Sequence, residues 1–128
     1  MTTPPTSIRT YEVHAETTRT FGRVLASARQ HHFIVDGPVQ NGCPGEEVTP
    51  AELFLGGVAA CGAELIQVIA REEGVRVDHV AVDVTGTVDR SRQKHAGVTT
   101  FTTVDVEIVL SGADGAHAAA LVEGFRRR

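Results

Sequence analysis

The longest apolar stretch of the chain lies near its middle and predicts a long helix from Thr49 to Gly74. Thr49 and Glu52 have the spacing of a capping box, and Pro50 stands at the first helical position, where proline is tolerated. Gly74 offers a left-handed stop, and Arg71 in the last turn suits the negative end of the helix dipole. Both ends of the helix are therefore predicted by their own residues.

Between residues 53 and 63 this helix carries no charge, and its apolar residues surround it instead of forming a stripe. A helix of that kind is buried on most sides, and one small sheet with one short helix supplies too little cover. Gly56 and Gly57 lie in its interior, where each costs roughly 1 kcal/mol relative to alanine. Such glycines are tolerated where another backbone comes close. We therefore expect a second copy of the chain to cross the helix at Gly56 and Gly57.

Segments that alternate between apolar and polar residues predict strands on both sides of the helix. A turn at residues 36–38 and a loop at 39–48 lead into the long helix, and a second helix begins near Asp114, which can cap it. This order of elements predicts an α+β fold, with the helices packed against antiparallel sheet. The expected strands are residues 8–18, 23–28, 32–35, 80–84 and 104–110.

Length and composition favour one domain over residues 1–128, with residues 1–6 as a disordered lead-in. The net charge of -4 and the lack of a basic stripe argue against a nucleic-acid partner. Glu52 and Glu64 bracket the longest apolar run, so no run reaches the length of a membrane span, and we expect no membrane association. With only two cysteines and no apolar signal core at the start, we expect a cytoplasmic location.

Cys61 lies in the most apolar part of the helix and is either inert packing or a reactive thiol. A buried cysteine far from a helix N-terminus needs a nearby cation to ionise, and an arginine held by a carboxylate suits that role. The available residues are Arg19, Arg23 and Glu52. Glu52 and Cys61 are nine residues apart, which places them on opposite faces and about 13 Å apart along the axis. Glu52 can therefore reach only the thiol of a second, antiparallel copy, which predicts a site at a dimer interface.

The run TPAELFLGGVAACGAELI, which follows a short β meander and a D-G-P turn, resembles the OsmC/Ohr family of osmotically induced and organic hydroperoxide resistance proteins. The resemblance extends from about Tyr11 to Arg128. It implies an OsmC-like fold: a β meander, a long central helix, an antiparallel strand pair and a second helix, assembled as an intertwined homodimer. It also implies a peroxidatic Cys61, a catalytic Glu52 and an arginine from the meander, which is Arg19 or Arg23.

Two features depart from the family pattern. The hydroperoxide-resistance branch places its glutamate ten residues before the cysteine, whereas here the spacing is nine and Ala51 holds the other position. Family members also carry a resolving cysteine after the last helix, followed by a closing strand, while this sequence stops at Arg128. Either the sequence is truncated there, or another thiol serves recycling. Cys43 is a candidate resolving thiol, and a free surface thiol is the alternative.

The leading hypothesis is a thiol-dependent peroxidase whose organic hydroperoxide substrate enters an apolar interface pocket lined by Phe54 and Leu55. Turnover needs an external dithiol reductant. No cofactor and no metal are expected, because His31 and His32 lack the ligand spacing of a zinc site. The alternative is an OsmC-fold protein without peroxidase activity that binds an apolar small molecule in the same pocket. A partner-binding or sensor role is a third hypothesis.

Overall fold

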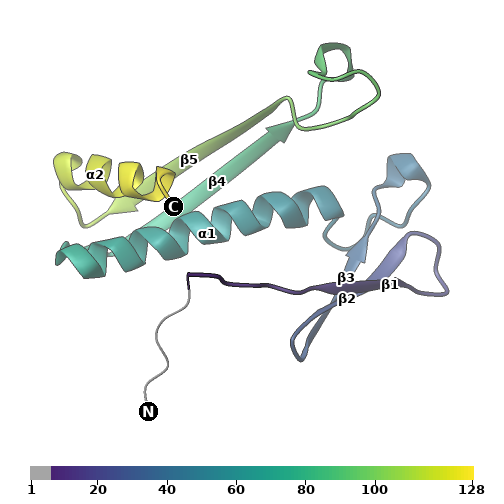
Figure 1. The fold of residues 1–128 in the computed structure, drawn as a ribbon, viewed down its shortest axis with the longest axis horizontal. Helices are drawn as coiled ribbons and strands as arrows, with labels where there is room; N and C mark the ends of the chain where they lie inside the picture. The colour runs from purple at the N-terminus through teal and green to yellow at the C-terminus, as the bar shows by residue number, and fades with distance from the viewer. Residues whose placement is uncertain (1–6) are drawn as a thin grey trace. The chain divides into compact units, whose positions relative to one another are not determined.

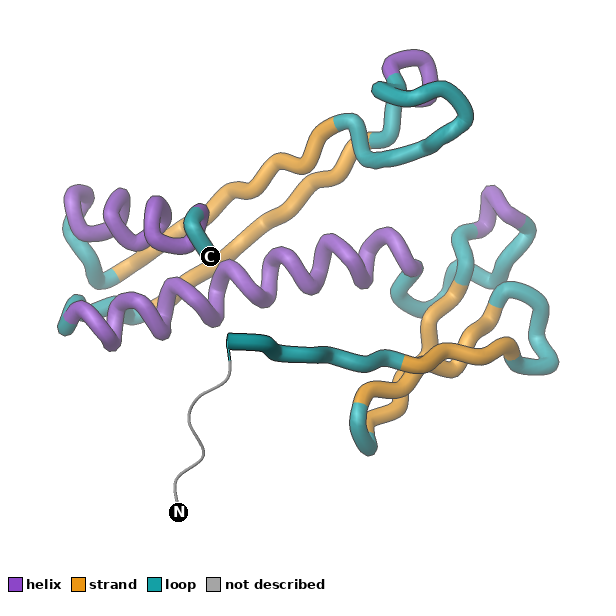
Figure 2. Tube along the Cα trace, in the orientation of Figure 1, coloured by secondary structure: helices purple, strands orange, loops and turns teal. Residues whose placement is uncertain are grey.

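The computed structural model describes residues 7–128 and divides into two compact units, one ending at Glu52 and one beginning at Leu53 (Figure 1). Figure 2 shows the helices and strands of each unit along the trace. The lead-in expected at residues 1–6 lies outside the described residues. The expectation of one domain over the whole chain stays a prediction.

The first unit is an antiparallel meander of three strands, β1 (His14–Thr17), β2 (Arg23–Ala28) and β3 (His31–Asp36), followed by the short 3-10 helix η1 (Val39–Asn41). Ala26 of β2 and Val35 of β3 are buried. The strand expected from Ile8 begins only at His14, because β2 supplies ladder partners for His14–Thr17 alone. The other two strands of the meander are confirmed.

The second unit contains most of helix α1 (Pro50–Glu73), the hairpin of β4 (His79–Thr87) and β5 (Thr103–Ser111), and helix α2 (Gly115–Arg126). A 3-10 turn, η2 (Arg90–Arg92), lies in the hairpin loop. The two strands pair along their whole length, and the predicted alternation places Val82 opposite Ile108. The α+β fold with two helices and antiparallel strands is therefore confirmed.

The predicted helix ends are confirmed by their hydrogen bonds. The Thr49 amide and hydroxyl both donate to Glu52 Oε1, at 3.0 and 2.8 Å, and the Glu52 amide donates to Thr49 Oγ1 at 3.4 Å. Gly74 ends α1 in the left-handed region at φ 67°, and Asp114 Oδ1 accepts from the amide of His117 at 2.8 Å. These local contacts mark both ends of α1 and the start of α2.

The hydrophobic core of the second unit lies against the C-terminal half of α1. Ile66, Ile69 and Ala70 pack against Leu121 of α2, and all four are buried. Partly buried residues from the hairpin, the connecting loop and α2 surround them: Val75, Val77, Val80, Ile108, Leu110 and Phe125. Gly62 allows the close approach of α2, since a Cβ there would lie 3.3 Å from Phe125 Cζ.

The expectation that α1 is buried on most sides is wrong for the single chain. Its buried residues are Gly62, Ile66, Ile69 and Ala70, whereas the first three turns are mostly exposed. The physical reason is that the buried core contacts from α2 and the hairpin lie at the C-terminal half, whereas near its start α1 meets the hairpin only in part, at Gly86 and Phe101. The sequence-based argument on membrane spans also needs correction, since α1 is long and apolar enough to cross a membrane by length and composition. A core helix passes the same test, and α1 supplies three of the four residues of this core.

Candidate functional site

Cys61 is exposed on helix α1, which corrects the expectation that this fold hides the thiol. Phe54 precedes it by seven residues, so the two side chains leave the helix on nearly the same face, about 10 Å apart along the axis. Phe54 is 61% exposed. Gly57 lies between them along the helix, and a Cβ added there would meet no atom within 4 Å apart from its neighbours in the helix. The thiol therefore lies on an accessible, apolar helix face.

The two predicted pocket residues belong to a small aromatic cluster in the second unit. The rings of Phe54 and Phe101 stack with centroids 5.9 Å apart and an interplanar angle of 18°. Leu55 and Phe101 meet above Gly86 of β4, where an added Cβ would lie 2.9 Å from Leu55 Cδ1 and 2.7 Å from Phe101 Cε1. Sequence reasoning missed Phe101, because nothing local shows that the hairpin loop folds back toward the start of α1.

Glu52 is a member of the capping box. Its hydrogen bonds with the backbone amide and the hydroxyl of Thr49 lower the pKa of its carboxyl. The carboxylate is therefore ionised and used locally by its own chain. A catalytic role for Glu52 stays a prediction.

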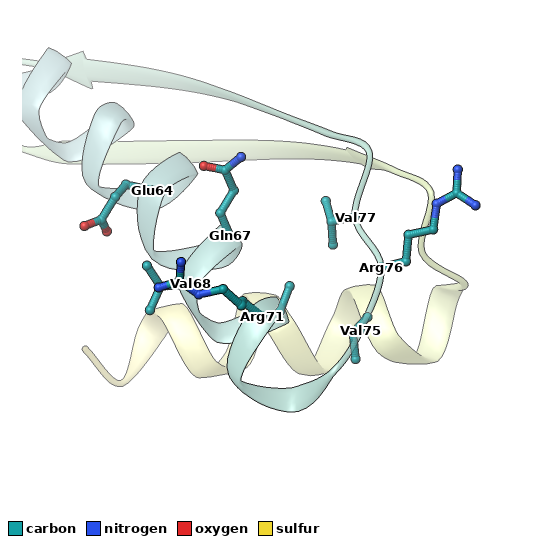
Figure 3. Close-up of a pocket in the computed structure, with 8 residues that line it drawn as sticks. Glu64, Gln67, Val68, Arg71, Val75, Arg76 and Val77 are labelled. Carbon is teal, nitrogen blue, oxygen red and sulfur yellow. The ribbon is translucent and has the colours of Figure 1, made fainter.

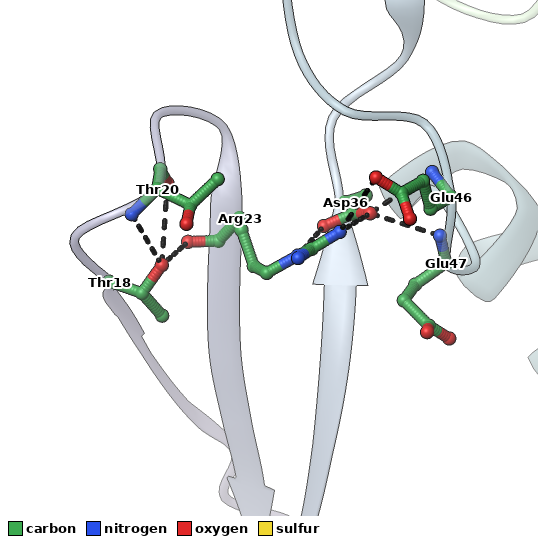
Figure 4. A network of polar contacts seen from close by, with 6 residues as sticks. All are labelled: Thr18, Thr20, Arg23, Asp36, Glu46 and Glu47. Atoms are coloured by element: carbon green, nitrogen blue, oxygen red, sulfur yellow. Dashed lines mark hydrogen bonds and ion pairs between the residues drawn. The ribbon is translucent and has the colours of Figure 1, made fainter.

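Arg23 forms a two-pronged ion pair in the first unit (Figure 4). Its Nε donates to Asp36 Oδ1 at 2.8 Å and its Nη2 donates to Asp36 Oδ2 at 2.9 Å. The amides of Glu46 and Glu47 donate to the same Oδ2 at 3.1 and 3.0 Å. The Asp36 side chain is fully buried and the Arg23 side chain is 29% exposed. Four donors thus compensate the burial of one carboxylate.

The sequence pattern predicts Asp36 only as part of a turn. Asp36 is instead the last residue of β3, and it lies directly opposite Arg23, the first residue of β2. An acidic residue that ends an apolar strand, with an arginine starting the preceding strand, is the signal that predicts such a pair in a hairpin. The side-chain hydrogen bonds from Arg23 hold the pKa of Asp36 well below its usual value of 3.8 and raise the pKa of Arg23.

We predict that Asp36→Asn lowers the free energy of unfolding at neutral pH. The variant's free energy of unfolding should also fall less than that of the wild type as the pH decreases. The lowered pKa means that Asp36 stabilises the fold above about pH 4 and that this contribution is lost as the pH falls through the folded-state value. Near pH 3 the wild type should therefore take up about one more proton on unfolding than the variant. Urea unfolding followed between pH 2 and 7 measures this difference.

The variant should keep some acid sensitivity, because hydrogen bonds also lower the pKa of Glu52, Asp89 and Asp114. Asp78→Asn is a matched control, since that carboxylate pairs with Arg76 at an exposed position. Equal pH profiles for wild type and Asp36→Asn would contradict the assigned role of the buried pair.

Arg19 lies in the turn between β1 and β2. Thr18 organises that turn, since its Oγ1 donates to the carbonyl of Arg23 at 2.9 Å and its amide donates to the same carbonyl at 3.2 Å. Within residues 7–128 no hydrogen bond or ion pair involves the Arg19 guanidinium. Of the two arginines predicted for the site, Arg23 is therefore held by a carboxylate and Arg19 is not.

The remaining candidates show no metal chemistry among the described residues. His31 and His32 are both exposed on β3, and no group of three or more metal-ligating side chains gathers within residues 7–128. Cys43 and Cys61 are both free thiols. Cys43 is half-buried in the first unit, where its Sγ lies 3.8 Å from the carbonyl oxygen of Asn41.

A surface cavity of about 480 Å³ lies at the other end of α1 (Figure 3). Apolar side chains line it together with Glu64, Gln67, Arg71 and Arg76, whereas Cys61 is not among its lining residues. Arg76 points away from the helix in Figure 3 and pairs with Asp78, its Nε lying 2.8 Å from Asp78 Oδ1. The cavity is therefore separate from the predicted reaction site.

The structure thus brings together Arg23 with Asp36, Glu52 with Thr49, and Phe54 with Leu55 and Phe101. Cys61 belongs to the second unit and both arginines to the first. The pairing of the thiol with an arginine stays a prediction.

Comparison with known proteins decides the family. A family model for OsmC-like proteins matches residues 43–128. The chain belongs to the OsmC-like protein family. A search among curated proteins gives no match.

Solved OsmC-like structures share the fold of this OsmC-like chain. An OsmC-like protein from Mycoplasma pneumoniae is similar with a TM-score of 0.79 and 16% identity, covering 94% of this chain and 82% of that one. An organic hydroperoxide resistance protein OsmC from Legionella pneumophila has a TM-score of 0.72 and 20% identity, and the match covers 95% of this chain and 85% of that one. An organic hydroperoxide resistance protein from Elizabethkingia anophelis has a TM-score of 0.74 and 17% identity, and the match covers 94% of this chain and 84% of that one. These matches extend over both units of the chain.

Proposed function

We propose that this OsmC-like protein is a cytoplasmic, thiol-dependent peroxidase that reduces organic hydroperoxides through Cys61. The observation that supports this most is the position of the thiol, which is exposed on an apolar helix face in a chain of this family. Two of the similar structures are organic hydroperoxide resistance proteins. A solvent-accessible thiol beside apolar surface suits a substrate that has a reactive peroxide end and an apolar body.

The active form is proposed to be a homodimer. The exposed residues Leu53, Gly56, Gly57 and Ala60 form a stripe of mostly small apolar residues on the side of α1 that the core does not use. A Cβ added at Gly56 or Gly57 would meet no atom of this chain, so a second backbone has room to approach there. Cys61 lies at the margin of that stripe, and a second copy covering it would enclose the thiol in a pocket bordered by Phe54 and Leu55. Sedimentation equilibrium tests the dimer, and a monomer at micromolar concentration would contradict it.

The proposed chemistry has two balanced steps. The Cys61 thiolate attacks the terminal oxygen of the hydroperoxide, so an S–O bond forms as the O–O bond breaks, and the leaving alkoxide takes a proton to become an alcohol. The sulfur is then a sulfenic acid. One thiol of an external dithiol then attacks this sulfur, which forms a mixed disulfide and releases water. The second thiol of the reductant attacks the mixed disulfide, which restores the Cys61 thiol and leaves the reductant as a disulfide.

Arg19 is the arginine that we assign to the thiolate. Arg23 already shares its charge with the buried Asp36, so it adds little net positive potential elsewhere. The Arg19 guanidinium has no such partner within residues 7–128. It can stabilise both the thiolate and the departing oxygen, while Glu52 of the second copy would orient it.

Rapid mixing of the protein with one equivalent of cumene hydroperoxide tests the proposed function. We expect a sulfenic acid at Cys61, trapped by dimedone and located by mass spectrometry, to form much faster than on a free thiol at the same pH. Trapping no faster than on that free thiol would instead support the alternative function, binding of an apolar small molecule beside Phe54 and Phe101.

The two arginines should differ in this assay. Arg19→Ala is expected to slow sulfenic acid formation by about 10²-fold while leaving the unfolding midpoint nearly unchanged, because it removes a charge that stabilises the reacting sulfur and oxygen. Arg23→Ala should lower the unfolding midpoint clearly, since it leaves Asp36 buried without its cation. The reverse pattern would show that Arg23 is the arginine of the site.

A further inference from the structure

The Cys43 side chain fills the space above two glycines in the first unit. A Cβ added at Gly22 or Gly37 would overlap the Sγ of Cys43, and one at Gly37 would also lie 2.8 Å from its Cβ. The two glycines are joined by a hydrogen bond of 2.7 Å from the Gly37 amide to the Gly22 carbonyl. The loop that carries Cys43 therefore packs directly onto the closed end of the meander.

Both glycines adjoin residues of functional interest. Gly22 precedes Arg23 and ends the turn that carries Arg19, while Gly37 follows Asp36. The loop is held in place by its own backbone, since the Gly45 amide donates to the Gly37 carbonyl at 3.1 Å and the Cys43 amide to the Pro38 carbonyl at 3.4 Å. These bonds restrain the backbone at position 43, so a larger side chain that keeps the rotamer of Cys43 would press against Gly22 and Gly37.

We infer that Cys43 is a positioning residue, whose small side chain fixes the turn carrying Arg19 and the adjacent Arg23–Asp36 pair. It acts by filling volume, not as the resolving thiol that the sequence suggested as one option. Only its effect on peroxidase turnover rests on the proposed function. Its effect on the ion pair stands on the contacts of the first unit alone.

Two substitutions separate the steric role from the redox role. Cys43→Ser keeps a small side chain but removes the thiol, so it should retain Asp36 titration and turnover with an external dithiol. Cys43→Met keeps a sulfur but adds volume above the glycines, where overpacking is costly. In Cys43→Met the Asp36 carboxyl, followed by carbon-detected NMR, should titrate closer to its usual pKa of 3.8. Turnover should fall by about 10²-fold, because the displaced turn carries Arg19 away from its position.

A compensating pair provides the decisive control. Gly37→Ala should shift the Asp36 titration in the same direction as Cys43→Met, because its new methyl group overlaps Cys43. Adding Cys43→Gly to Gly37→Ala frees that space and should restore part of the wild-type titration, which a double-mutant cycle measures.

Each outcome decides the inference. A wild-type Asp36 titration in Cys43→Met would overturn it. A Cys43→Ser variant that forms sulfenic acid at the wild-type rate but does not turn over would overturn it too, by identifying Cys43 as the resolving thiol. If the wild type reduces no hydroperoxide, the proposed function fails, while the titrations of Cys43→Met and Gly37→Ala still test the inference.

Discussion

Cys61→Ser is expected to reduce the rate of hydroperoxide consumption to that of the buffer blank. The proposed reaction passes through a covalent bond between oxygen and the sulfur of Cys61, and a serine hydroxyl stays protonated and weakly nucleophilic at neutral pH. The loss should be equally complete at all substrate concentrations, because the variant removes the reacting atom and leaves the apolar binding surface of Phe54 in place. Steady-state assays with cumene hydroperoxide and excess dithiol measure it.

Glu73→Ser is a suitable control for this variant. It places the same residue at an exposed position at the end of the same helix, and full activity is expected. The circular dichroism spectra of Cys61→Ser and the wild type should agree, since the thiol contributes no buried core contact within its own chain. Undiminished peroxidase activity in Cys61→Ser would remove the proposed mechanism altogether.

Leu121→Ala is expected to lower the free energy of unfolding by about 2–5 kcal/mol. Leu121 is fully buried, and it is the residue of α2 that enters the core formed by Ile66, Ile69 and Ala70. Removing its branched end leaves a cavity between two helices that cannot close without moving the hairpin. A loss of this size is a large fraction of the stability of a small protein. Urea unfolding at fixed protein concentration measures it, because a dimer's stability depends on concentration.

Val109→Ala is the matched control for the core substitution. Val109 is 53% exposed on β5, on the strand face opposite Ile108 and Leu110, so its truncation should cost less than about 0.5 kcal/mol. Similar losses for the two variants would show that the core between α1 and α2 is not the main source of stability in the second unit.

Most elements of this fold could be predicted from short stretches of sequence. The capping box of Thr49 and Glu52, the stop at Gly74 and the cap at Asp114 act within a few residues, so each could be recognised without a structure. The alternating valines of the hairpin give its strands in the same way. The first strand was predicted too long, because its start depends on how far β2 extends beside it and not on its own residues.

The burial of α1 and the pairing of Asp36 with Arg23 could not be predicted from short stretches of sequence. An apolar helix is expected to be a covered helix, yet the buried core that α2 and the hairpin form with α1 lies at the C-terminal half, around Ile66 and Ile69. Near the start of α1, Phe54 stays 61% exposed although it stacks on Phe101 of the hairpin loop. The sequence predicts Asp36 as a turn residue, whereas the register of the meander makes it the buried partner of Arg23. Neither result is contained in a local pattern.

The helices, the hairpin and the family motif that ends in Cys61 can all be recognised in the amino-acid sequence, because caps, turns and periodicity depend on residues close together in the chain. Three features became visible only in the folded chain: the exposure of the Cys61 thiol, the stacking of Phe101 on Phe54, and the packing of Cys43 on Gly22 and Gly37. These contacts join segments far apart in sequence, and strand register and loop packing decide which of the many sterically possible neighbours actually meet.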